Sequence, residues 1–129
     1  MHDAEPFHRP IKIRQVPGKG RGVFATRPIA EGELIITDTC LILTAEECEL
    51  LAETSLRDYP LAHPENEEEN CLALGPISLV NHSEEPNCHR VWTKDDQGDW
   101  TVSLCASRPI AEGEELTYRY RTVWFEVAG

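Results

Sequence analysis

Four hydrogen-bonding side chains crowd the segment of residues 81–87, directly after an apolar run at residues 77–80. We expect the apolar run to be buried, so Asn81 and His82 leave the interior of the protein together. Buried polar groups need hydrogen-bond partners, which makes a chance cluster of this kind costly. Pro86 disfavours a helical conformation in the residue before it and favours a turn. The segment is therefore either a structural pin or half of a ligand site.

A second candidate is the segment of residues 18–22, in which glycine alternates with Lys19 and Arg21. Glycines let a backbone come close to a ligand and expose its N–H groups, which suits an anion or a carboxylate. The spacing is not that of a phosphate-binding loop of the Walker type. A plain hairpin turn between two strands is the alternative interpretation.

The third candidate is the segment of residues 114–120, where Tyr118 and Tyr120 stand two positions apart. In a strand, both tyrosines share one face with Leu116. Two adjacent phenols form a semi-polar wall that can hold an apolar stem and contact its polar tip. The alternative is a pair of core tyrosines whose hydroxyl groups have partners.

The five cysteines have no C-x-x-C spacing, and their odd count leaves one unpaired; they are Cys40, Cys48, Cys71, Cys88 and Cys105. Most have apolar neighbours, as Cys105 does, so we expect reduced, buried thiols rather than disulfides or a zinc site. A Cys–His–Asn hydrolase built from Cys88, His82 and Asn81 is an alternative, because these residues are close in sequence. No neighbouring segment suggests an oxyanion site for it.

These segments must be positioned by a chain with many short strand signals. Alternation or apolar runs predict strands at residues 11–14, 34–36, 41–43 and 100–104. Residues 88–93 and 100–106 flank residues 94–99, whose composition indicates a hairpin loop. One helix is predicted after a capping box formed by Thr44 and Glu47, and we expect it to fray by residues 58–60.

The chain contains an internal repeat, because residues 25–33 recur as residues 106–114. Each copy predicts a strand end, a proline turn, one buried isoleucine and a glycine at positive φ before another strand. Two copies are too few for a solenoid. They indicate two similar strand–turn–strand corners in a compact β fold.

The composition indicates one soluble globular domain of 129 residues, 40% apolar and 27% charged. The net charge of -11 argues against nucleic-acid binding and favours a cationic partner, although an acidic surface can also serve solubility alone. Residues 65–70 form an acidic loop with the same two interpretations. No apolar run could cross a membrane, and residues 1–10 lack the apolar core of a signal peptide. We therefore expect a cytoplasmic protein, or a nuclear one in a eukaryote.

Taken in order, the glycine turn and two further motifs resemble the SET domain of protein lysine methyltransferases. The motifs are Asn-His-Ser-x-x-Pro-Asn at residues 81–87 and Gly-Glu-Glu-Leu-Thr-Tyr-x-Tyr at residues 113–120. The resemblance runs from Ile11 to Tyr120 and is to minimal members of the family, similar to short viral and bacterial forms.

The resemblance implies a single SET-like domain over residues 1–129, with its core at residues 11–120, a variable insert at about 44–70 and a tail at 121–129. The implied fold is mainly β: a β-clip of several small sheets with one short helix and a C-terminal pseudoknot. The variable insert contains Arg57, Asp58 and Tyr59, for which substrate contact and a plain surface role both stay open.

The resemblance also implies a cleft for S-adenosylmethionine, with S-adenosylhomocysteine as the product. The cofactor-binding residues that it implies are Lys19, Gly20, Arg21, Gly22, Asn81, His82 and Trp124. Asn81 would hold the ammonium group, and the backbone at His82 would meet the adenine, with a structural role for the His82 side chain. Trp124 or Phe125 would either stack over the adenine or cap the core.

Tyr120 matches the family's catalytic tyrosine, and a neutral lysine amine would take the methyl group by direct displacement. Tyr118 stands where family members carry phenylalanine or tyrosine; a hydroxyl there leaves less room, which implies transfer of one or two methyl groups. The substrate would be a lysine-containing basic protein, histone-like or other. A non-catalytic SET-like binding module is the alternative, although the presence of Tyr120 and Asn81 favours the enzyme.

Many family members have a cysteine after Asn-His-Ser that binds zinc together with a cysteine-rich tail. Here Glu84 stands in that position and residues 121–129 contain no cysteine, so we expect no metal site. Something else must then close the lysine channel. A second subunit could supply that wall, which makes a homodimer an expectation.

Overall fold

The structure, a computed structural model, describes residues 9–18 and 20–119. Its strands form two sheets, one in the order β1-β2-β9-β6 and one in the order β4-β5-β3-β8-β7. The elements, in chain order, are β1 (Ile11–Val16), β2 (Gly20–Ala25), β3 (Leu34–Leu43), α1 (Ala45–Leu51), β4 (Leu61–Ala62), β5 (Asn70–Ala73), the 3-10 helix η2 (Pro76–Leu79), β6 (Asn81–His82), β7 (Cys88–Lys94), β8 (Trp100–Ala106) and β9 (Glu115–Tyr118). The expectation of a mainly β fold made of small sheets with one short helix is confirmed.

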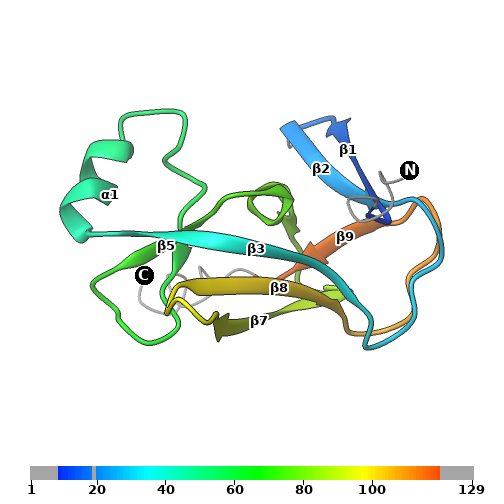
Figure 1. Ribbon diagram of the computed structural model, residues 1–129. Helices are drawn as coiled ribbons and strands as arrows, with labels where there is room; N and C mark the ends of the chain where they lie inside the picture. Colours follow the sequence, from blue (N-terminus) through cyan, green and yellow to red (C-terminus); the bar gives the residue numbers. More distant parts are fainter. Residues whose placement is uncertain (1–8, 19, 120–129) are drawn as a thin grey trace, which may run out of the picture.

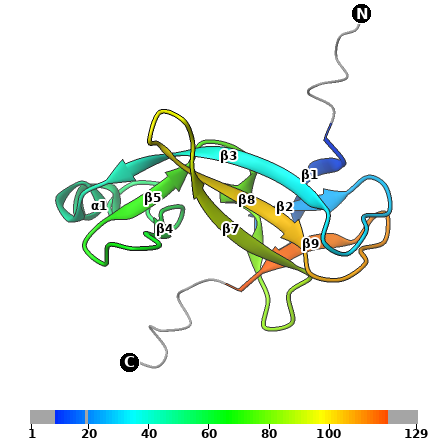
Figure 2. The ribbon, with the colours of Figure 1, turned by 60° about the horizontal axis from the view of Figure 1, so that its bottom comes forward.

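The long strands β3 and β8 run side by side through the middle of the molecule, with the β1–β2 hairpin at one end and α1 at the other (Figures 1 and 2). The core fills the space between the two sheets. Its largest fully buried side chains include Tyr118, Ile36, Ile77, Leu104 and Leu116. Within the described residues, no helix has the length and apolar character that a membrane crossing requires.

The two apolar segments predicted as separate strands form one continuous strand, β3. Asp38 and Cys40 face the core while Thr37 and Thr39 are exposed, so the alternation of a strand bridges the two apolar runs. The sequence prediction separated them because the linking residues are polar. A register shift between Leu34 and Ile36 further obscures the pattern.

The predicted hairpin and the predicted start of the helix are confirmed, but the helix ends at Leu51, before the expected fraying at residues 58–60. Strands β7 and β8 pair from Cys88↔Ala106 to Lys94↔Trp100 around the predicted loop. At α1, the Glu47 amide donates to Thr44 Oγ1 at 3.1 Å, and the Thr44 amide donates to Glu47 Oε1 at 2.9 Å. The capping box thus starts a helix that buries none of its own residues.

The internal repeat forms two corners that pair with each other. Ile29 and Ile110, both 2% exposed, exchange backbone hydrogen bonds of 2.9 Å in each direction. Gly32 and Gly113 have φ angles of +84° and +87°, as the repeat predicts. The connections β2–β3 and β8–β9 therefore run alongside each other at the right of Figure 1. This pairing brings the C-terminal strand β9 back to β2.

The cysteines are free thiols, as expected, but their burial differs from the prediction. Cys40, Cys71 and Cys88 are buried, whereas Cys48 and Cys105 are only half-buried. Cys105 has buried neighbours in sequence because alternate residues of β8 face opposite sides of the sheet.

The apolar run at residues 77–80 is only half buried, because it forms the 3-10 helix η2. Ile77 and Val80 are fully buried, while Ser78 and Leu79 remain partly exposed. The Ile77 amide donates to the buried carboxylate of Asp38 at 3.0 Å. A Cβ at Gly75 would collide with that carboxylate, so the glycine lets Asp38 hold the start of η2.

Candidate active site

The three segments that the sequence singled out meet around β9. This strand pairs with β2 through Val23↔Leu116 and runs parallel to β6 through Asn81↔Thr117. The Ser83 amide extends the second pairing by donating to Tyr118 O at 3.1 Å. The glycine turn, the polar segment of residues 81–87 and the tyrosine strand therefore form one continuous region.

Asn87 is the structural pin of this region. It is 1% exposed, and its Nδ2 atom donates to Glu115 O at 2.8 Å while its Oδ1 atom accepts from the Thr117 amide at 2.9 Å. The Asn87 carbonyl also accepts from the Ser107 amide at 2.8 Å. Nδ2 also donates to Glu114 Oε2 at 3.2 Å, so the side chain uses its hydrogen-bonding groups within the protein and we assign it no role in ligand binding.

Asn81 is held differently, by its amide nitrogen alone. Nδ2 donates to Arg21 O at 2.9 Å and to Glu115 Oε2 at 2.7 Å. Both partners are acceptors, so the nitrogen must face them, and the orientation of the amide is fixed. Among residues 9–18 and 20–119, no hydrogen-bond donor contacts Oδ1 of Asn81. That oxygen is therefore available to a donor on a ligand.

Gly22 allows the Asn81 amide to approach the hairpin. A Cβ at this position would lie 2.7 Å from Glu115 Oε2, 2.8 Å from Val16 Cγ2 and 3.2 Å from Asn81 Nδ2. Real Cβ atoms essentially never make contacts under 3.0 Å, and 3.2 Å is unusually tight, so a side chain at Gly22 would push the Glu115 carboxylate away and crowd the Asn81 amide. The glycine turn is a hairpin between β1 and β2, as the plain interpretation of its sequence predicted, and its role in ligand binding stays a prediction.

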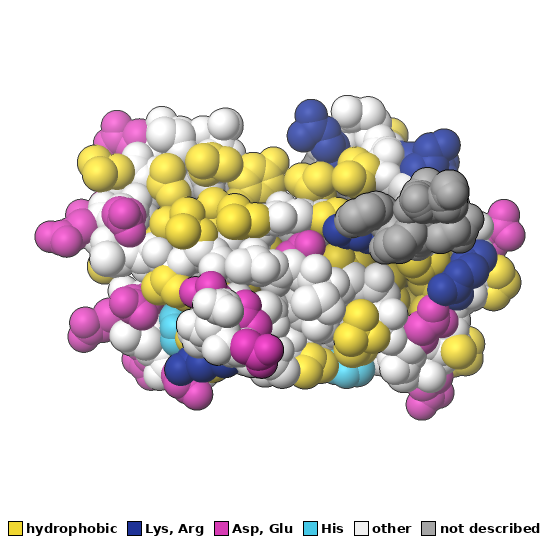
Figure 3. Space-filling view, in the orientation of Figure 1, with side chains coloured by type: hydrophobic (Ala, Val, Ile, Leu, Met, Phe, Trp, Pro, Cys, Tyr) yellow, Lys and Arg dark blue, Asp and Glu magenta, His cyan; other side chains and the backbone are white. Residues whose placement is uncertain are grey.

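A cavity of about 400 Å³ opens beside Asn81, between the β1–β2 hairpin and the insert (residues 44–70). The hairpin contributes Gln15, Gly20 and Arg21 to its lining. A notch at the upper edge of the molecule marks the same side in the space-filling view (Figure 3). Volumes of this size are typical of small-molecule sites.

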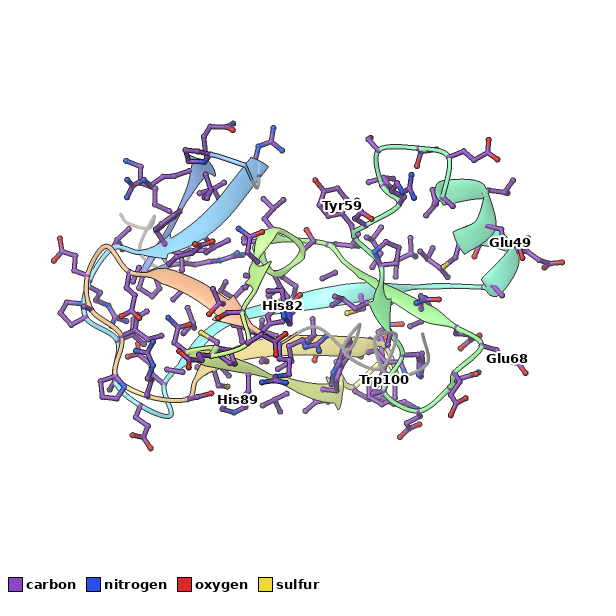
Figure 4. All side chains as sticks on the ribbon, turned by 180° about the vertical axis from the view of Figure 1, so that it is seen from behind. Glu49, Tyr59, Glu68, His82, His89 and Trp100 are labelled. Atoms are coloured by element: carbon purple, nitrogen blue, oxygen red, sulfur yellow. The ribbon has the colours of Figure 1, made fainter. Side chains whose placement is uncertain are left out.

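The insert and η2 supply the rest of the lining. Ser55, Asp58 and Tyr59 come from the insert, and Ser78 and Leu79 come from η2. Tyr59 points from the insert towards the β1–β2 hairpin (Figure 4). Sequence reasoning left Asp58 and Tyr59 open and missed the other three, because no periodic pattern links the insert to the glycine turn.

His82 faces an ion pair rather than the cavity. Its Nε2 atom lies 2.8 Å from Glu84 Oε2, and Arg119 Nη1 lies 3.3 Å from Glu84 Oε1. The hydrogen bond from His82, followed by the charge of Arg119, holds the pKa of Glu84 below its ordinary value. The ionised carboxylate only accepts, so Nε2 of His82 carries a proton. This contact supports a structural role for the His82 side chain.

Tyr118 lies in the core, 2% exposed, and the Arg90 guanidinium stands 4.5 Å from the centroid of its ring. It does not line the cavity. Tyr120, Lys19, Trp124 and Phe125 lie outside the described residues. Their predicted roles, like those of the other site residues, stay predictions.

The structure argues against a hydrolase built on Cys88. This thiol is 2% exposed, and burial raises its pKa to about 12, so it has almost no thiolate at neutral pH. His82 is bonded to Glu84, and the amide nitrogen of Asn81 is bonded to Arg21 and Glu115. None of these contacts activates the thiol.

The chain is similar to proteins of one family. The family model of the SET domain matches residues 20–121. A histone-lysine N-methyltransferase of Schizosaccharomyces pombe, H3 lysine-37 specific, is 36% identical over 119 residues, which is 91% of this chain and 78% of that protein. The N-lysine methyltransferase KMT5A-A of Danio rerio is 34% identical over 85% of this chain, but the chain covers only 35% of that protein.

The fold is similar to a crystal structure from Plasmodium falciparum, of a protein provisionally assigned as a histone methyltransferase. The TM-score is 0.73 at 25% sequence identity, over 92% of this chain and 98% of that one. The expected SET-like arrangement is therefore confirmed at the level of the fold.

Proposed function

The chain belongs to the SET domain family, and we propose that it transfers methyl groups from S-adenosylmethionine to lysine side chains of a basic protein. Relatives named as lysine methyltransferases support protein lysine methylation as the general activity. The observation that carries the proposal is the Asn81 amide, fixed by Arg21 and Glu115 at the edge of a cavity that fits a small molecule.

The residues that line the cavity fit the methionine half of this donor. Oδ1 of Asn81 accepts a hydrogen bond from an ammonium group, and such bonds to a charged partner are stronger than neutral ones. Gly20 and Arg21 line the facing wall. A Cβ at Gly22 would force this wall and Asn81 apart, so the absence of a side chain at Gly22 keeps them close together. Lys19, the backbone at His82 and Trp124 complete the proposed set of binding residues.

S-adenosylmethionine supplies a methyl group on a positively charged sulfur, which a neutral lysine amine takes by direct displacement. The residues of the chain act by alignment, which can contribute several kcal/mol when the reacting atoms are well oriented. We assign Tyr120 to the reacting centre, where its hydroxyl group and nearby carbonyl oxygens would hold the methyl group of bound S-adenosylmethionine by weak C–H···O contacts. A desolvated channel lowers the pKa of the lysine and so favours the neutral amine.

The proposed substrate is a lysine-containing basic protein, such as a histone-like protein. Acidic side chains lie over the end of the molecule that carries α1 and also elsewhere on the same face (Figure 3), and the net charge is -11. This field raises the encounter rate with a cationic partner.

Tyr118 fills space near the proposed lysine site, so we propose transfer of one or two methyl groups. A homodimer is proposed as the way in which the lysine channel is closed.

The test is methyl transfer from labelled S-adenosylmethionine to a panel of basic proteins, with Tyr120→Phe as the comparison. We expect label on lysine with the unmodified protein and far less with the variant. Equal labelling by both proteins would remove Tyr120 from its role. Peptide binding without any transfer would instead favour a non-catalytic SET-like module.

A further inference from the structure

The guanidinium group of Arg119 is held by Glu84. Arg119 Nη2 donates to Glu84 O at 2.8 Å, and Nη1 lies 3.3 Å from Glu84 Oε1. His82 approaches the other carboxylate oxygen of Glu84 at 2.8 Å. The guanidinium therefore contacts both the backbone and the side chain of Glu84, a two-point contact that fixes its direction.

Arg119 is also held on its backbone, by Arg90 from the neighbouring sheet. Arg90 Nη2 donates to Arg119 O at 3.1 Å, while the same guanidinium stacks at 4.5 Å on the ring of Tyr118. The backbone pairing of β9 with residues 81–83 ends one residue earlier, at the bond from the Ser83 amide to Tyr118 O. Beyond that bond, Arg119 is held by the backbone and side chain of Glu84 and by the side chain of Arg90.

We propose that Glu84 and Arg90 are positioning residues that clamp Arg119 so that the chain enters Tyr120 in the orientation that methyl transfer requires. This inference rests on the proposed function. The Arg119 carbonyl belongs to the peptide unit that joins Arg119 to Tyr120. Because a peptide unit is planar, fixing its oxygen restricts the direction in which the chain continues.

The clamp affects geometry more than stability. The side chains of Glu84 and Arg119 are 61% and 49% exposed, and exposed ion pairs contribute little to folding. Catalysis by alignment is more sensitive, since a misplacement of about 1 Å far from the chemistry can lower a rate about 100-fold. Cofactor affinity should be spared, because Asn81 is held by Arg21 and Glu115 without help from the clamp.

The test compares Glu84→Ala with Glu85→Ala, which removes the same charge from the next residue. Glu85 is exposed, and its backbone amide donates to Ser83 Oγ at 3.0 Å. We expect Glu84→Ala to lower kcat at least about tenfold, with the dissociation constant of S-adenosylhomocysteine and the thermal midpoint equal to those of Glu85→Ala. Arg90→Met, which removes the hydrogen bond from Arg90 to Arg119 O, should lower kcat in the same way. Glu84→Gln should have a kcat between those of Glu84→Ala and the unmodified protein.

Equal kcat values for Glu84→Ala and Glu85→Ala would overturn the clamp. The clamp would also be overturned if Glu84→Ala lost S-adenosylhomocysteine binding or thermal stability in proportion to its loss of kcat, because a merely structural role predicts that pattern. If Glu84→Ala does not fold, Arg90→Met decides the question by the same three measurements. An unmodified protein that binds S-adenosylhomocysteine but methylates no lysine would instead refute the proposed function and, with it, the reaction that the clamp serves.

Discussion

Replacing Gly22 by alanine should weaken binding of S-adenosylhomocysteine without removing any group that contacts it. The backbone φ of Gly22 lies outside the left-handed region, so alanine can adopt the conformation. The added Cβ would lie 2.7 Å from Glu115 Oε2 and 3.2 Å from Asn81 Nδ2. Ordinary carbon contacts are about 3.5 Å or longer. The carboxylate and the amide must therefore retreat, and the pair that fixes Asn81 is disturbed.

The magnitude follows from the hydrogen bond that depends on this pair. If Oδ1 of Asn81 no longer faces the ligand ammonium, one bond to a charged group is lost, worth about 1.5–3 kcal/mol. The dissociation constant should then rise about 10-fold to 150-fold. Overpacking beside Val16 should also lower the free energy of unfolding by about 1–3 kcal/mol.

Isothermal titration calorimetry measures the affinity and urea unfolding the stability, with Gly98→Ala as the control. Gly98 has a φ of +85° and no atom within 4 Å of an added Cβ, so alanine there costs about 1–2 kcal/mol through its backbone alone. We expect Gly98→Ala to lose stability and keep its affinity. An affinity of Gly22→Ala within twofold of the unmodified protein would refute the reasoning about Asn81.

Three further results are expected. Asn87→Ala should lower the free energy of unfolding by about 3 kcal/mol in urea titrations, because it removes a fully buried side chain and leaves the partly buried amide of Thr117 without its acceptor; a loss below about 1 kcal/mol would contradict the role of Asn87 as a structural pin. The pKa values of Glu33 and Glu114 are lowered, mainly by Arg27 and by the Ala111 amide respectively, so the unfolded chain binds protons more readily. The free energy of unfolding should therefore fall as the pH drops below about 4.5, and a Glu33→Gln/Glu114→Gln variant should show a smaller fall; an equal fall would exclude these carboxylates. Tyr118→Phe should give more highly methylated lysine by mass spectrometry, and an unchanged product would argue against its role in product specificity.

The features that the sequence predicted well depend on local physical chemistry. The capping box of Thr44 and Glu47 needs only a four-residue segment, and the hairpin over residues 88–106 needs only alternation around a turn. The repeat predicted its positive-φ glycines for the same reason. The two corners pair through Ile29 and Ile110, which are far apart in sequence. This long-range contact could not be predicted from either copy of the motif alone.

The features that it missed depend on contacts between distant segments. β3 is continuous because it pairs with β5 over one part of its length and with β8 over the other, while Thr37 and Thr39 lie on the exposed face of the sheet. Ser55 and Tyr59 reach the cavity because the insert folds back beside the hairpin. The Asn81 motif could be read as a ligand site from its sequence, but the partner that fixes its amide, Glu115, could be found only by folding β9 against β6.

The central claim is that the cavity beside Asn81 holds the methyl donor. The most direct test is a crystal structure of the protein with S-adenosylhomocysteine. We predict density for the ligand between the β1–β2 hairpin and the insert, with its ammonium nitrogen within hydrogen-bond distance of Asn81 Oδ1. Clear density for the ligand at another surface, with only solvent beside Asn81, would contradict the account.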